Sequence, residues 1–211
     1  MKSPLTGMVN HFLKCNLEQI LSRSLLHCHS PNLHSIVFRD SPQMIRLFIA
    51  QPNHKLFLNH PNLFKDYYNQ SVGFHAHHCE LTLVPTRGKL SNWIIKPSVV
   101  GKLLLKEYEY RSAITQGQIG FTYVGEKLFN SKEFKHIPVG ESKYMPATDI
   151  HTVFVTKGEW ASWFVLEGKE NLNYDNKCWS TTDVEKEDFS RLYKPVKKNM
   201  LLKLLKEAHL V

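Results

Sequence analysis

The chain has 211 residues, of which 42% are hydrophobic and 22% are charged, and this balance is ordinary for a globular protein. A chain of this length suits one domain with extensions and can bury a core. The formal charge of +8 comes from lysines that are spread along the chain, which argues for a solvated basic surface and against nucleic acid as a partner.

Membrane and secreted proteins are also not expected. No apolar run approaches the roughly 18 residues needed to cross a bilayer, and the N-terminus lacks the long apolar core of a signal peptide. The cysteines are scattered and form no Cys-x-x-Cys pair, which is untypical of a disulfide scaffold or a zinc ribbon. We therefore expect reduced thiols, no membrane partner and a cytoplasmic location.

Residues 8–27 have the spacing of an amphipathic helix. The apolar stripe consists of Phe12, Leu13, Leu17, Ile20, Leu21 and Leu25. We expect this helix to pack on the main body of the protein. A Ser-Pro-Asn sequence at 30–32 then predicts a turn.

From residue 36 onward, short apolar runs alternate with Pro, Gly and Asn, which is typical of strands joined by turns. The strand-length runs are 36–40, 44–51, 55–61, 72–85, 90–97, 103–114, 119–125, 132–140, 149–156 and 161–168. A succession of about ten short strands predicts an all-β sandwich or barrel.

The C-terminal part is predicted to be helical. Residues 181–193 open with Thr/Asp capping chemistry, and a second helix follows Pro195. Its apolar face consists of Met200, Leu201, Leu204, Leu205 and Ala208. This face suits packing on the β region, with a dimer contact or a basic membrane-surface helix as alternatives. We thus expect an N-terminal helical extension (1–35), a β-barrel (36–175) and a C-terminal helical tail (176–211).

Residues 73–88, GFHAHHCELTLVPTRG, hold three histidines and a glutamate within six positions. Because residues two apart on a strand share a face, His75 and His77 face one side and His78 and Glu80 the other. Imidazole is a good ligand for first-row transition metals. A third ligand is expected from His151, which follows a proline-containing turn and begins a β-type segment. The alternative is that these histidines only pack in the core.

Together the two segments resemble the two motifs of the cupin superfamily. The first motif is His-x-His followed by an acid and a glycine, and the second is a glycine, a proline and a histidine at fixed spacing. The matching residues are His75, His77, Glu80 and Gly88 in the first motif and Gly140, Pro146 and His151 in the second. The first segment is most similar to small bacterial cupins with a His-x-His-x-x-Asp/Glu sequence. The resemblance implies a mainly β fold, a double-stranded β-helix or jelly-roll barrel, here with N-terminal and C-terminal helices.

The chain departs from the cupin pattern at three positions. Leu81 occupies the place of the usual glutamate, so Glu80 faces inward only if a β-bulge turns it. In the second motif Thr148 and Val155 replace a glycine and an asparagine. A three-histidine site is therefore favoured, with Glu80 as a possible fourth ligand.

A rival set of ligands uses the other face of the same strand. His78, Glu80 and His151 would form the two-histidine, one-carboxylate triad of 2-oxoglutarate oxygenases. Such an enzyme also needs a basic residue for the co-substrate, for which Lys157 is the nearest match. Strand parity decides between the two sets, since both cannot point inward.

The resemblance implies a non-haem iron(II) dioxygenase, an oxidoreductase that acts on a small molecule. Iron(II) is the expected metal, with zinc, nickel and manganese as alternatives. Arg87 follows the first motif and would attract an anionic substrate. The other candidate pocket residues are Cys79, Trp93 and Trp163.

Two non-oxygenase functions stay open. A non-catalytic ligand-binding or sensor protein would keep the cavity without turnover, and a metal-free epimerase would need a His or Tyr base paired with a carboxylate. The resemblance also implies a homodimer, because pairing covers exposed sheet edges.

Overall fold

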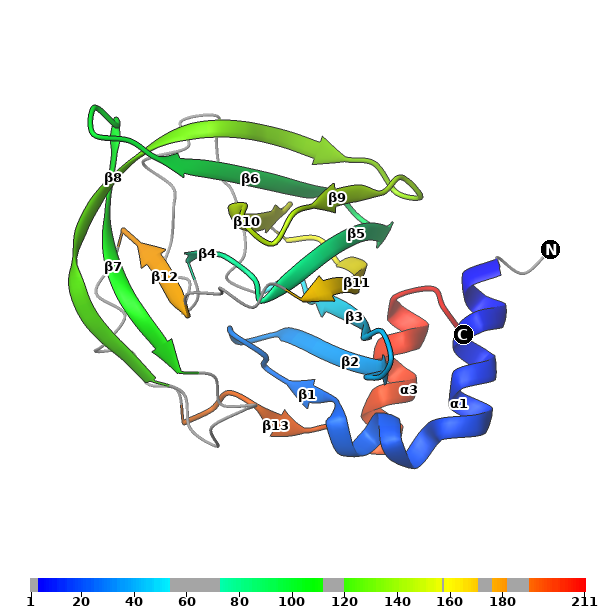
Figure 1. Cartoon of the computed structure of the whole chain (residues 1–211). Coiled ribbons are helices and arrows are strands. Elements are labelled where there is room, and N and C mark those ends of the chain that lie inside the picture. Colours follow the sequence, from blue (N-terminus) through cyan, green and yellow to red (C-terminus); the bar gives the residue numbers. More distant parts are fainter. Residues whose placement is uncertain (1–3, 54–72, 112–119, 157, 171–175, 182–189) are drawn as a thin grey trace.

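A computed structural model describes residues 4–53, 73–111, 120–156, 158–170, 176–181 and 190–211. Antiparallel strands make up most of it, with one helix near each end of the chain (Figure 1). The helices are α1 (Pro4–Arg23) and α3 (Lys198–Glu207). The strands are β1 (Leu25–Leu26), β2 (Leu33–Arg39), β3 (Ile45–Ala50), β4 (Phe74–His75), β5 (Cys79–Arg87), β6 (Leu90–Pro97), β7 (Leu103–Arg111), β8 (Gly120–Ile137), β9 (Lys143–Met145), β10 (Ile150–Val155), β11 (Ala161–Glu170), β12 (Lys177–Ser180) and β13 (Lys194–Pro195). The predicted mainly β fold with terminal helices is confirmed.

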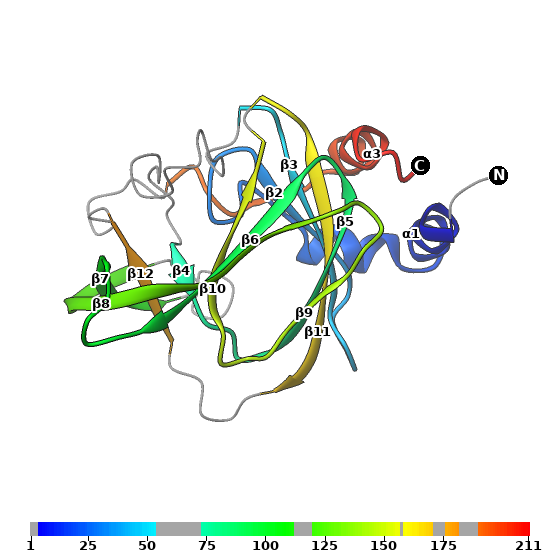
Figure 2. The same cartoon turned by 90° about the horizontal axis from the view of Figure 1, so that it is seen from above.

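The strands pair in two groups. One sheet has the order β13-β1-β2-β3-β11-β5-β9, and in the second group β10, β4, β12, β7, β8 and β6 pair in a closed ring. Along the chain β3, β5, β9 and β11 belong to the first sheet, whereas β4, β6, β8 and β10 belong to the second. The orders β3-β11-β5-β9 and β4-β10-β6-β8 are those of a jelly roll. Figure 2 shows the two sets of strands from above.

The outer face of the first sheet is covered by both helices. Apolar residues of β2, β3 and β11 form one cluster with Ile20 of α1 and with Leu201, Leu204 and Leu205 of α3. The apolar face of the C-terminal helix therefore packs on the sheet, as predicted. In the part of the chain that the structure describes, no helix is long and apolar enough to span a membrane.

The inner face of the same sheet carries alternate residues of each strand. On β5 the buried positions alternate, and Cys79, Leu81 and Leu83 join Trp163 and Val165 of β11 in a second cluster. On β3, Leu47 and Ile49 face the helices, whereas Phe48 stacks on Trp163 on the inner side. The period of two along each strand thus decides which side chains enter the interior of the jelly roll.

Several element boundaries differ from the predicted ones. The N-terminal helix ends at Arg23, and Leu25 lies in β1. The two strands expected at 119–125 and 132–140 are one continuous strand, β8. Gly125 makes no turn there. It stays in the strand, paired with Glu107 beside a register shift in the β7–β8 pairing.

The sheets also extend past both predicted domain boundaries. The boundary after residue 35 falls inside β2, and β12 pairs with β7 and β4 of the second group. The strand expected at 55–61 and most of the helix expected at 181–193 lie outside the described residues.

Candidate metal site

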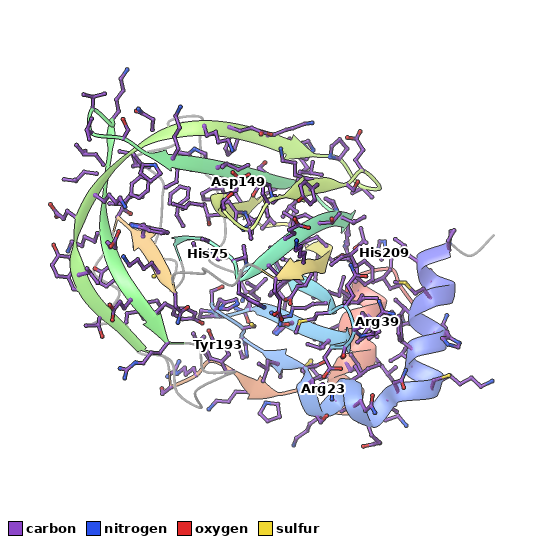
Figure 3. The ribbon with its side chains drawn as sticks, viewed as in Figure 1. Arg23, Arg39, His75, Asp149, Tyr193 and His209 are labelled. Atoms are coloured by element: carbon purple, nitrogen blue, oxygen red, sulfur yellow. The ribbon has the colours of Figure 1, made fainter. Side chains whose placement is uncertain are left out.

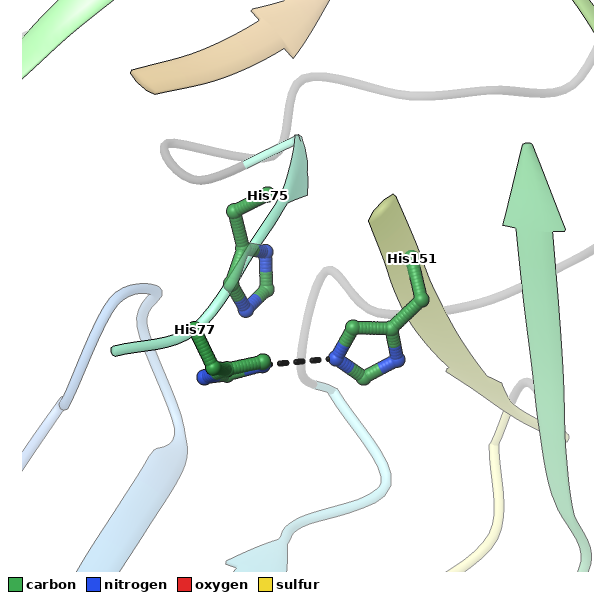
Figure 4. Close-up of side chains that lie close together, drawn as sticks. All are labelled: His75, His77 and His151. Atoms are coloured by element: carbon green, nitrogen blue, oxygen red, sulfur yellow. Dashed lines mark hydrogen bonds between the residues drawn. The ribbon is translucent and has the colours of Figure 1, made fainter. Parts of the chain in front are cut away.

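The structure brings His75, His77 and His151 together in the interior of the jelly roll. His75 lies on β4 and is the antiparallel partner of His151 on β10, and His77 follows two residues after His75. Figure 3 shows His75 between the sheets, well away from Arg23 and His209 on the helical side. One ligand nitrogen of each ring lies within 4.8 Å of the others (Figure 4).

Hydrogen bonds fix the tautomers of these rings. Nδ1 of His151 is 2.6 Å from Oδ1 of Asn92, and Nδ1 of His75 is 3.0 Å from the carbonyl oxygen of Gly73. Because both oxygens only accept, each Nδ1 carries the proton and donates it, which leaves each Nε2 with a lone pair. Nε2 of His77 lies 2.8 Å from Nε2 of His151 and therefore donates its proton to it. A metal ion that binds this nitrogen takes the place of that proton.

The site holds its imidazoles in the neutral, metal-binding form. Burial, followed by the charges of the neighbouring histidines, lowers the pKa of His77 well below its usual value. Burial and then the charge of His75 do the same for His151, which is only 3% exposed. Burial also lowers the pKa of His75. Three neutral imidazole nitrogens, one of them on a fully buried residue, fit the donor set that divalent first-row metals prefer.

Asn92 is a site residue that the sequence prediction missed. It lies on β6, is 1% exposed, and also donates from Nδ2 to Sδ of Met145 at 3.2 Å. An amide inside the apolar run LSNWIIKP of a buried strand is a signal of a polar partner. The identity of that partner needed the β6–β10 register, in which Asn92 and His151 lie on neighbouring strands.

The structure does not bring Glu80 to the three imidazoles. β5 alternates regularly, and the irregular pairing opposite Cys79 and Leu81 lies in β11. The carboxylate of Glu80 therefore lies on the other face, against Gly168, where it accepts a hydrogen bond from Tyr144 that raises the pKa of this phenol. Leu81 points inward and joins the apolar cluster.

The residues of the 2-oxoglutarate alternative are also kept apart. His78 has a 55% exposed side chain and lies beside Glu167, with 3.8 Å between Nε2 and Oε2. It shares a group with Cys79 and Glu167, whereas His151 belongs to the three-histidine group. The structure therefore brings His151 to His75 and His77 rather than to His78, although residues 76–78 lie between β4 and β5 and outside both strands. Lys157 lies outside the described residues.

The structure places the tryptophans among the candidate pocket residues in the core and Arg87 against helix α3. Arg87 donates to the carbonyl oxygen of Glu207 at the end of α3, and its guanidinium lies over the Trp160 ring. Trp93 donates from Nε1 to Ser131 and is 1% exposed. Trp163 stacks on Phe48 at 5.5 Å.

A different arginine faces the interior. Arg46 lies on β3 on the same side as Phe48, and its guanidinium lies 5.8 Å from the centre of that ring. His29 lies close enough to both His75 and Arg46 for their charges to act on its imidazole. Burial, then the charges of His75 and Arg46, lower the pKa of His29 to about 3. Arg46 is thus a positive side chain on the same side of the fold as the histidines.

Comparisons with known proteins give only distant structural likenesses. No protein-family model and no curated protein matches the chain. A protein from Neisseria meningitidis is 10% identical with a TM-score of 0.33, over 64% of this chain and 83% of that chain. A cupin domain from Bordetella pertussis is 13% identical with a TM-score of 0.34, over 66% and 95%.

Hydroxypropylphosphonic acid epoxidase from S. wedmorenis is 10% identical with a TM-score of 0.33 over 64% of this chain. The match spans about half of the epoxidase chain, 49%. Likenesses at this level carry no inference about function, and the jelly roll is established by the strand order itself.

Proposed function

We propose that this protein is a metal-binding cupin that acts as a non-haem iron(II) dioxygenase on a small molecule. The observation that supports it is the meeting of three neutral imidazoles, two of them with Nδ1 held by an oxygen acceptor. His75, His77 and His151 would hold the metal through Nε2. A metal with three protein ligands keeps positions for substrate and oxygen and supplies the chemistry of oxygen activation.

Two hydrogen-bond acceptors orient the histidine rings of the site. Asn92 holds the His151 ring in one orientation, and the Gly73 carbonyl does so for His75. The rings of Phe74 and Trp93 pack edge-on at 4.9 Å behind the histidine segment. Phe74 alternates with His75 along β4 and Trp93 with Asn92 along β6, so both rings point to the opposite face and stabilise these strands from behind.

An anionic substrate is part of the proposal. Nε of Arg46 is buried and has no hydrogen-bond partner among the described residues, while Nη2 lies 3.9 Å from Oε1 of Glu167. A buried guanidinium N–H of this kind is a donor for a carboxylate or phosphonate. Arg46 therefore takes the role that the sequence suggested for Arg87.

The test is a metal analysis of protein purified without a histidine tag and reconstituted anaerobically with iron(II). We expect about one iron per chain in the wild type at the three-histidine site, lost in His75→Ala, His77→Ala and His151→Ala. His136→Ala is the matched control, because this histidine is exposed and its Nδ1 bonds only the carbonyl of Leu90. Oxygen consumption by the loaded protein then separates an enzyme from a metal-binding sensor.

Two results would contradict the metal site, and a third would contradict the dioxygenase activity. Wild-type protein that takes up no iron(II) would refute the metal site. Iron binding that survives all three substitutions while the variants remain folded would place the metal elsewhere. Bound iron without oxygen consumption over a broad panel of small acids would favour the non-catalytic sensor.

A further inference from the structure

A second group of ligand-type side chains lies where β5 pairs with β11. His78, Cys79 and Glu167 each offer one ligand atom, and these atoms all lie within 4.8 Å of one another. The thiol of Cys79 donates to the Glu167 carboxylate, and Nε2 of His78 lies 3.8 Å from Oε2 of the same residue. The group shares no residue with the three-histidine site, although His77 and His78 are neighbours in the chain.

The donor set decides which cation suits this group. An imidazole nitrogen, a thiolate sulfur and a carboxylate oxygen are the three ligand types that bind zinc(II) in proteins. The thiolate selects against hard cations such as magnesium and calcium. A divalent ion that binds the Cys79 sulfur displaces the thiol proton. We propose that His78, Cys79 and Glu167 form a second metal site, which takes a thiophilic divalent cation of the zinc(II) type.

The surroundings give this site two fixed ligands and one open side. Cys79 is 2% exposed and is fixed by the β5 ladder, and the Glu167 side chain is 16% exposed. His78 has a 55% exposed side chain, so a cation can reach the group from solvent past this ring. The group therefore combines one buried and one partly buried ligand with one exposed ligand.

One positive side chain competes with the cation. Nη2 of Arg46 lies 3.9 Å from Oε1 of Glu167, whereas the distance of 3.8 Å to His78 belongs to Oε2. The two carboxylate oxygens thus serve different partners, and Oε2 stays available to a metal while Oε1 faces the arginine. The positive charge of Arg46 repels a cation at this site and weakens its binding.

Cobalt(II) is the probe that separates this site from the three-histidine site. A thiolate bound to cobalt(II) gives a charge-transfer absorption that a site of three histidines lacks. We expect this band in the wild type, its loss in Cys79→Ser, and binding weakened about tenfold or more in Glu167→Gln and His78→Gln. His151→Ala removes one equivalent of cobalt and keeps the band. Cys15→Ser is the control, because Cys15 is an exposed free thiol on α1.

The experiment has clear contrary outcomes. Wild-type protein with excess cobalt(II) and no thiolate band refutes the second site, whatever the three-histidine site does. A band that persists in Cys79→Ser, or that disappears in Cys15→Ser, assigns the thiolate to another cysteine. If Cys79→Ser does not fold, His78→Gln decides the question, because this side chain is largely exposed and its loss leaves the core intact. An unchanged cobalt affinity in His78→Gln overturns the proposed ligand set.

Discussion

The hydrogen bond from His151 to Asn92 offers a direct test of how the candidate site is organised. The perturbation is Asn92→Ala, which removes the acceptor 2.6 Å from Nδ1 of His151 and leaves that buried N–H without a partner. Loss of a buried partner costs about 1–3 kcal/mol of stability. The ring also loses its fixed tautomer and orientation, and outer partners of metal ligands typically contribute about 10–100-fold to metal affinity. That range corresponds to about 1.4–2.7 kcal/mol of binding free energy.

The assay is an anaerobic iron(II) titration against a chromogenic chelator, with urea unfolding of the metal-free protein beside it. Asn92→Asp should restore the affinity, because a carboxylate also accepts from Nδ1. Asn130→Ala on β8 is the matched control, since its amide bonds Ser98 and the backbone of Lys102 rather than an imidazole. A folded Asn92→Ala variant that binds iron(II) within about threefold of wild type would refute the reasoning.

Three further predictions concern stability, each measured by urea unfolding. Phe74→Ala empties a fully buried position against Trp93 and should cost about 3–5 kcal/mol; a cost below about 1 kcal/mol would contradict the packing. Burial lowers the pKa of His34 from 6.5 to about 4, so the unfolded chain takes up the proton first as the pH falls. The contribution of neutral His34 to the free energy of unfolding is complete above pH 6.5, and it decreases by about 2 kcal/mol between pH 7 and 5. A His34→Gln variant whose stability falls with the same pH slope as wild type would contradict this. Gly88→Ala should be more destabilising than Gly140→Ala. Both glycines have a positive φ, which costs an alanine about 1–2 kcal/mol at either site. At Gly88, unlike Gly140, the added Cβ would also overlap the carbonyl oxygen of Trp160. Equal costs at the two glycines would show that the strand turn relaxes.

Part of the candidate site followed from the sequence because it depends on local geometry. The sequence predicted His75 and His77 together and Glu80 apart from the period of two along one strand. In the structure residues 76–78 lie between β4 and β5, which belong to different sheets, and the same histidines still meet. The same parity put Cys79 on the inner side. It also meant that Glu80 needed a β-bulge to become a ligand, and the alternation of β5 is regular around Glu80.

The sequence by itself determined the class of fold, because short apolar runs with turns between them can bury their side chains only as a sandwich or barrel of strands. The tertiary structure alone decided which distant residues meet. Asn92 reaches His151 through the β6–β10 register, and Glu167 reaches Cys79 through the β5–β11 register. Arg87 shares the strand parity of the inward-facing Leu81 and Leu83, but a register irregularity between Pro85 and Arg87 lets it reach Glu207 of α3 instead. Pairing between strands far apart in the chain depends on the global minimum of burial and hydrogen bonding, which no local stretch of sequence contains.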